Sequence, residues 1–115
     1  MIDYEPQLVS ALKTVLPTKH ELALTGKENT PCITYQERNN AAAETGDTLG
    51  YSRISFTVKV WSREIADLQR YSLEIDKILR PLGFTRVSTS ELADRQSTMK
   101  QKILTYEALA SENFN

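Results

Sequence analysis

The residues of this chain that could take part in catalysis are few and lie far apart in the sequence. The only histidine, His20, stands beside Glu21, and a histidine next to a carboxylate can act as a general base. A hydrolase would also need a serine or cysteine nucleophile, and no nucleophile motif lies near this pair. We therefore expect His20 to be a structural or surface residue.

Cys32 is the only cysteine, so the chain cannot form an internal disulfide. It follows a proline and opens a predicted strand, where a buried cysteine behaves as a small apolar residue. We favour this structural role over that of a reactive thiol. With one histidine and one cysteine, the sequence offers no zinc-type ligand cluster, and we predict neither a metal nor a cofactor.

The remaining candidates for chemistry are carboxylates and glycines. Glu74 and Asp76 are close in sequence, but on a helix they point to different parts of its surface. The glycines are too far apart for a phosphate-binding loop; they are Gly26, Gly46, Gly50 and Gly83. We predict that the protein is not an enzyme.

Length and charge narrow the function further. The chain has 115 residues, with Lys+Arg 14 against Asp+Glu 15, and this suits one domain over residues 1–115. A net charge of −1 disfavours non-specific binding to nucleic acid, and we predict no sequence-specific binding. The basic residues Arg95, Lys100 and Lys102 are more simply explained as a solvated strand edge. We find neither an apolar run of about 18–20 residues nor a secretion signal, and so expect no membrane association and folding in the cytoplasm.

The clearest structural pattern runs from Tyr51 to Phe84. Ile54, Phe56, Val58 and Val60 alternate with polar residues, which predicts a half-buried strand. Ser62 can cap a helix that follows. The apolar stripe of this helix repeats at three- and four-residue steps and comprises Ile65, Leu68, Ser72, Ile75 and Leu79. Pro81 and Gly83 should end the helix.

Weaker patterns surround this unit. Asp3 can cap a first helix that carries Leu8, Leu12, Val15 and Leu16 and stops at Pro17. A weak strand is predicted at His20–Leu24, and further strands at Cys32–Asn39, Thr85–Thr89 and Met99–Ala108, with a loop at Ser90–Ser97. In the final strand, Met99 and Ile103 point one way while Leu104 and Tyr106 point the other. A bulge can explain this impure alternation, and so can burial on one face by helices and on the other by a second subunit.

Together these patterns predict an α+β fold with two helices packed on one face of a mostly antiparallel, roughly four-stranded sheet. Residues of about 39–50 form a predicted mobile loop, and residues 110–115 a loose C-terminal tail. The loop is either merely flexible or an arm that orders against a partner, because long loops are often contact segments.

Several segments resemble minor tail proteins of long-tailed phages and prophages. They are Pro31–Glu37 with Asn39-Asn40, Tyr51-Ser52 leading into a strand that ends in Val60-Trp61, Ile75-Asp76, Leu82–Arg86 and Lys102–Glu107. Their order and spacing between Pro31 and Glu107 carry the resemblance. Within this group the chain is similar to the tail-completion, tail-terminator and head–tail joining proteins.

The resemblance implies a structural virion protein with no catalytic residue and no cofactor. It implies a ring, usually of six copies, at the head-proximal end of the tail tube, with the tail-tube protein and a head-completion or connector protein as partners. The protein would be found in the virion tail, and in the host cytoplasm during assembly. Such a ring-former also needs a semi-polar surface for its neighbours, with a heterologous contact that closes.

We predict partner contacts in the loop and on the strands that such a ring would present. In the loop they are Asn39, Asn40, Glu44, Asp47 and Thr48, and on the strands Tyr51, Trp61 and Tyr106. Glu44 and Asp47, if they face a lumen, would repel DNA that passes through it.

One alternative comes from a different class of protein. The α+β pattern alone is also compatible with a host ferredoxin-like binding or regulatory module that recognises a peptide or a small molecule.

Overall fold

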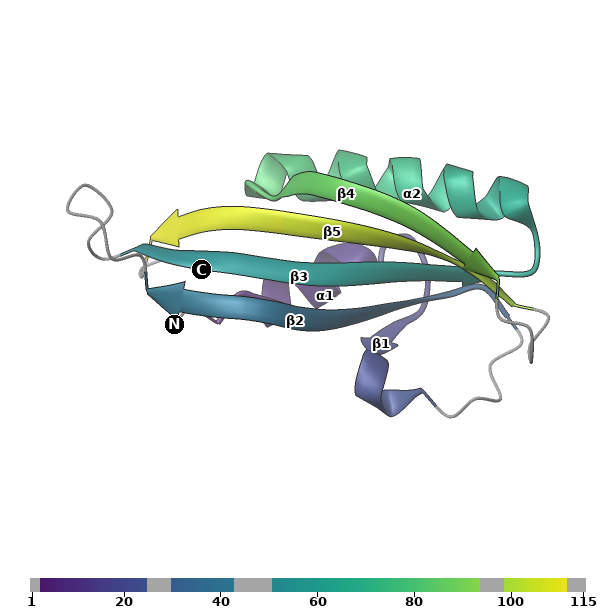
Figure 1. Cartoon of the computed structure of the whole chain (residues 1–115), viewed down its shortest axis with the longest axis horizontal. Coiled ribbons are helices and arrows are strands. Elements are labelled where there is room, and N and C mark those ends of the chain that lie inside the picture. Colours follow the sequence, from purple (N-terminus) through teal and green to yellow (C-terminus); the bar gives the residue numbers. More distant parts are fainter. Residues whose placement is uncertain (1–2, 25–29, 43–50, 94–98, 112–115) are drawn as a thin grey trace.

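The computed structural model describes residues 3–24, 30–42, 51–93 and 99–111, which form an α+β fold with one mixed five-stranded sheet. The spatial order is β1-β2-β3-β5-β4, and every pair is antiparallel except β1 and β2. The strands are β1 (Thr18–His20), β2 (Cys32–Ala42), β3 (Tyr51–Ser62), β4 (Thr85–Ala93) and β5 (Lys100–Ser111). Helices α1 (Glu5–Leu12) and α2 (Ile65–Leu79) lie on one face of the sheet (Figure 1). The predicted fold class is confirmed.

Strand β3 is the centre of the sheet and carries the predicted alternation. Its apolar residues Ile54, Phe56, Val58 and Val60 are at most 1% exposed and face the helices, while the residues between them lie on the opposite side. β3 pairs with β2 on one side and with β5 on the other over nearly its whole length. On the helix side, β2 places Ile33 and Tyr35 directly opposite residues of this apolar set, and β5 does the same with Leu104, Tyr106 and Ala108.

The two helices close the core from one side. α2 buries Leu68, Ser72, Ile75 and Leu79 as its periodicity predicts, whereas Ile65, at its first turn, is 63% exposed. Ile65 departs from the predicted apolar stripe because it is the first residue of α2 and lies beyond the turns that pack on the sheet. α1 buries Leu8 and Leu12 in the same cluster.

Aromatic rings join the helix layer to the sheet. Phe56 lies at the centre, with ring centroids 5.5 Å from Tyr4, 5.0 Å from Phe84 and 5.6 Å from Tyr106. These four residues come from the start of α1, from β3, from the turn after α2 and from β5. Their packing is therefore a direct link between segments far apart in the sequence.

Strands β2 and β4 are longer than predicted. β2 continues beyond its predicted end at Asn39 through residues 40–42, which pair with Ser52–Ile54 and were expected in the loop; residues 43–50 lie outside the described chain. β4 continues through residues 90–93, which were also expected in a loop. β5 likewise includes Ala110 and Ser111 of the predicted tail. Backbone pairing with an existing neighbour extends these strands although the added residues, Leu92 apart, are small or polar.

The bulge that is one explanation for the impure alternation of the final strand is found instead in β2 and β4. The register shifts between Glu37 and Asn39 in β2 and between Arg86 and Ser88 in β4, while β5 pairs with β3 without a break. Each shift inserts one extra residue: Arg38 in β2 and Val87 in β4. The mixed alternation of β5 instead accompanies burial on both faces, since Leu104 is 0% and Thr105 7% exposed.

The helix starts also differ in detail. α1 begins at Glu5 after Tyr4, which makes no side-chain cap, so Asp3 lies one residue too early to cap it. The Ser62 hydroxyl accepts the N–H of Glu64 at 3.2 Å and donates to the Asp67 carboxylate at 3.1 Å, and Ser62 lies three residues before α2 begins at Ile65. The predicted weak strand at His20–Leu24 is in fact β1, which ends at His20, followed by a single 3-10 turn, η1 (Glu21–Ala23).

Candidate interaction surface

The face of the sheet that points away from the helices, here called the open face, is lined by alternating residues of four strands. On β2 and β3 these are mainly polar, and β5 and β4 continue the pattern. Its described members are Thr34, Gln36, Asn39, Arg53, Ser55, Thr57, Lys59, Trp61, Gln101, Ile103, Thr105, Glu107, Thr85, Val87, Ser88 and Ser90. This is the semi-polar surface that the sequence led us to expect.

One half of the open face is occupied by contacts within the chain. Trp61 Nε1 donates to Thr34 Oγ1 at 3.0 Å across β2 and β3, and both side chains are at least half-buried. The ammonium of Lys59 pairs with the carboxylate of Glu21, which η1 brings to this side of the sheet. Trp61 is thus a packing residue that keeps part of its ring exposed.

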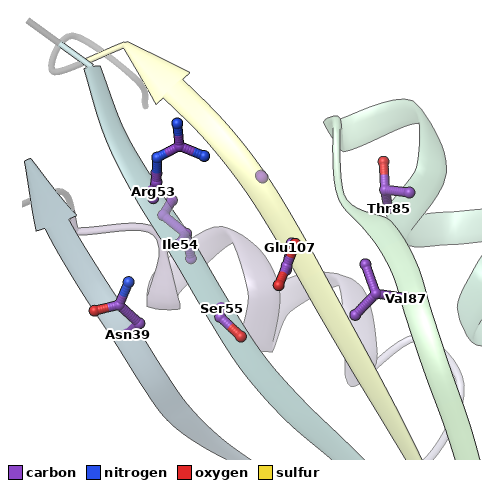
Figure 2. A pocket seen from close by; sticks show the side chains of 8 residues that line it. Asn39, Arg53, Ile54, Ser55, Thr85, Val87 and Glu107 are labelled. Atoms are coloured by element: carbon purple, nitrogen blue, oxygen red, sulfur yellow. The ribbon is translucent and has the colours of Figure 1, made fainter. Parts of the chain in front are cut away.

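The other half holds a depression of about 360 Å³. Figure 2 shows its lining side chains on four neighbouring strands: Asn39 on β2, Arg53 and Ser55 on β3, Glu107 on β5, and Thr85 and Val87 on β4. Asn39 and Val87 belong to the two bulged segments, so the bulges flank the depression. Because bulges bend and twist strands, they supply the local shape of this surface.

The charges in the depression are opposite in sign and come from adjacent strands. Ser55 is the direct neighbour of Glu107 across β3 and β5, so Arg53 lies diagonal to that carboxylate. Within residues 3–24, 30–42, 51–93 and 99–111 we find no ion pair to either group. The exposed Val87, at 49%, adds an apolar element beside them. Exposed polar and apolar groups side by side also occur in protein–protein contacts.

A second polar cluster lies on the helix side. Both oxygens of the Asp76 carboxylate are engaged: Oδ1 accepts from the Tyr106 hydroxyl at 2.5 Å, and Oδ2 pairs with Arg86 at 3.1 Å. Burial raises the pKa of Tyr106 well above its usual value, and the hydrogen bond and negative charge of Asp76 add to the rise. Arg80 lines the cleft of about 290 Å³ beside this cluster. With both oxygens occupied, Asp76 is suited to tying α2 to β5 and β4.

The other residues considered for chemistry are held by structural contacts, are buried or lie exposed on the surface. His20 Nδ1 accepts the N–H of Leu22 at 3.0 Å, and its ring lies edge-on to Tyr35. Cys32 is buried, and Glu74 is exposed on α2. Among the residues that the structure describes, no group of three or more histidine, cysteine or acidic side chains is placed to hold a metal ion. No described helix is long and apolar enough to cross a membrane.

The predicted contact residues that the structure describes do not gather at one site. Asn39 lines the depression, whereas Asn40 is half-buried and pairs with Ile54 on the helix side of the sheet. Trp61 lies at the other end of the open face, and Tyr51 is the first residue of β3. Tyr106 points into the core, is 1% exposed and is held by Asp76, so its role here is packing. The predicted loop contacts Glu44, Asp47 and Thr48 lie outside the described residues.

Sequence reasoning missed Arg53, Glu107 and Val87 as surface residues of one depression. The polar positions of β3 were visible as the alternate face of the strand. Only the pairing of β3 with β5, and the bulge in β4, bring the three together, and neither can be read from local sequence.

Comparison with known proteins identifies the fold. No protein-family model matches the sequence, and no curated protein matches it either. Among solved structures, the gp17 protein of bacteriophage SPP1 superposes with a TM-score of 0.55 at 16% identity, over 96% of this chain and 90% of that one. At this identity the likeness establishes a shared fold over nearly the full length of both chains.

Proposed function

We propose that this protein is a structural subunit of the tail of a long-tailed phage or prophage. In this role it completes or terminates the tail, or joins it to the head, as part of a ring at the head-proximal end of the tail tube. The observation that carries the proposal is the likeness to bacteriophage SPP1 gp17 over 96% of the chain. The order of the segments between Pro31 and Glu107 that resemble minor tail proteins supports it independently of that fold.

The open face offers a place for the partners that this role requires. A tail-tube protein on one side and a head-completion or connector protein on the other each need a contact surface on the ring subunit. The depression with Arg53, Glu107 and Val87 has the mixed character of such a surface. We assign no reaction, cofactor or metal to the protein.

Deletion of the reading frame tests the proposed role. Particles assembled without the protein should have tails of abnormal length or tails that fail to join heads, and the protein supplied from a plasmid should restore normal particles. Electron microscopy of the lysate gives the readout. Immunolabelling of free tails and free heads then distinguishes a tail-side from a connector-side position. Normal tails and normal joining in the deletion would contradict the proposal and leave the host binding module as the alternative.

A charge reversal tests the depression itself. Arg53→Glu places a second negative charge beside Glu107 on an exposed surface, so it should lower complementation of the deletion at least tenfold while changing the free energy of unfolding little. Lys77→Glu, on the exposed side of α2, is the matched control and should complement normally. Equal complementation by the two variants would show that the depression is not a partner contact.

A further inference from the structure

Among the described residues, the sheet has two edge segments without a strand partner on one side, and they lie on opposite sides of the sheet. β4 has β5 on one side, and no described strand pairs with its other side along Thr85–Ala93. β1 covers β2 only at Ile33–Tyr35, so Gln36–Asn39 has β3 as its only described strand neighbour (Figure 1). The backbone N–H and C=O groups on such edges are templates for pairing with another strand.

The β4 edge has few of the features that usually prevent such pairing. Proteins protect open edges with lysine, proline, bulges or very short strands. β4 is nine residues long and has neither lysine nor proline, and a single bulge at Val87 is its one interruption. Its described side chains are mostly small hydroxyls that are all exposed: Thr85, Ser88, Thr89 and Ser90. Small side chains allow a second strand to approach closely.

The directions of the strands make the two edges complementary. β2 and β3, β3 and β5, and β5 and β4 are all antiparallel pairs, so β4 runs opposite to β2 within one molecule. A second copy in the same orientation therefore brings its β2 antiparallel to the β4 of the first. Each copy then contacts the next through two different surfaces, which is a heterologous contact. Repeated from copy to copy, such contacts close into a ring when the rotation between neighbouring copies adds up to a full turn.

β1 determines where along β2 the partner strand can lie. It occupies the edge beside Ile33–Tyr35, so an incoming β4 must be offset toward Ala42. A closed, barrel-like sheet requires such a stagger of neighbouring strands along their length. With the offset, residues around Ser88 of one copy come beside residues around Asn39 of the next.

We propose that copies of this chain associate through their sheets, the β4 edge of one copy adding antiparallel to the Gln36–Asn39 edge of β2 in the next. This rests on the ring-forming function proposed above and names the contact that builds the ring. The occupant is a second copy because each chain carries both halves of the contact, one on each side. Closing the ring pairs every such edge.

Cysteine trapping at this contact tests the inference. The double variant Asn39→Cys/Ser88→Cys places one thiol on each edge, both at exposed positions of the open face, and Cys32 stays buried in every variant. A short bismaleimide tolerates a register offset of a residue or two. The control Asn39→Cys/Glu74→Cys keeps the first thiol and moves the second to the outer side of α2. Circular dichroism verifies that both variants fold.

The expected result is a ladder of covalent oligomers from the edge pair, ending in one discrete species that electron microscopy shows as a ring. The control, and each single variant, should stop at dimers. Equal ladders from both pairs, or no product beyond dimer from the edge pair at the highest soluble concentration, would overturn the inference. If the wild-type protein nevertheless forms rings on tails, only the edge contact is wrong. If the deletion phage also makes normal particles, the proposed function is wrong as well.

Discussion

At the scale of single residues, Phe56 has the most connected position in the core. It is fully buried in the central strand and lies within 5.0–5.6 Å, ring centroid to centroid, of Tyr4, Phe84 and Tyr106. The alternation of β3 alone predicts which way this ring points. The cluster of Asp76, Tyr106 and Arg86 is different, because its first two members are 30 residues apart and nothing in the local sequence marks them as partners.

We expect Phe56→Ala to lower the free energy of unfolding by roughly 3–5 kcal/mol, since it removes a buried ring and leaves a cavity among three other aromatic side chains. Urea denaturation followed by circular dichroism measures the loss. Leu22→Ala is the matched control, because Leu22 is 82% exposed and its truncation should change stability by less than about 0.5 kcal/mol. A loss below about 1 kcal/mol for Phe56→Ala would mean that the ring does not occupy the core.

The buried tyrosines predict a loss of stability at alkaline pH. Burial, more than any other cause, raises the pKa of Tyr4 and of Tyr106 far above the ordinary value of 10.0. Above pH 10 the unfolded chain therefore loses these protons while the folded chain keeps them. The free energy of unfolding should fall by about 1.4 kcal/mol per pH unit for each tyrosine.

Denaturation curves between pH 8 and pH 11.5 check this dependence. Near neutral pH, Tyr106→Phe should lower the free energy of unfolding by about 1–3 kcal/mol, because the variant lacks the hydroxyl that donates a hydrogen bond to Asp76. Above pH 10, the free energy of unfolding of the variant should fall less steeply than that of the wild type, because one buried tyrosine no longer contributes to the slope. Parallel curves for wild type and variant across that range would show that Tyr106 ionises as readily in the folded protein as in the unfolded chain.

At the scale of elements, the sequence predicts types and order well and boundaries poorly. Both helices, the central hairpin partners and the final strand follow from periodicity and from Pro81 and Gly83. The ends of β2 and β4 do not, because residues 39–42 and 90–93 have little apolar pattern and are held in strands by neighbours distant in sequence. The two bulges could not be predicted either, because each is defined by how its strand pairs with a neighbour distant in sequence.

The turn after α2 offers a test at this scale. α2 passes into η3 (Arg80–Leu82), and Gly83 then adopts a φ of 93°, which side chains disfavour. Nothing lies within 4 Å of the position where a Cβ would be added, so Gly83→Ala should cost about 1–2 kcal/mol through the backbone alone. Glu74→Ala on exposed α2 is the control, read out in the same urea experiment. A neutral Gly83→Ala would show that the turn can relax without disturbing β4.

At the scale of the whole molecule, the described residues form a sheet with one buried face, one open face and two edge segments without a strand partner. The buried face packs against the helices and stabilises the fold, while the open face and the edges are the surfaces proposed to contact other subunits. The sequence led us to expect a semi-polar surface for neighbours. It could not locate the depression or the edges, because both arise from the order of strands in space.

The isolated protein should be a monomer or a weak oligomer at micromolar concentration. A short edge contact buries little apolar surface, and stable association needs more area than such a contact supplies. A ring that forms on the tail tube gains that area from the tube. Multi-angle light scattering measures the state directly, and a stable hexamer in dilute solution would show that the ring does not need the tube.

The central claim, that this chain is a building block of a virion, is tested most directly by quantitative mass spectrometry of purified particles from the phage or prophage that encodes it. We predict the protein in intact particles at a fixed, low copy number relative to the major tail protein, retained after gradient purification and high-salt washing. If the protein is abundant in the lysate and absent from the particles, the account is contradicted.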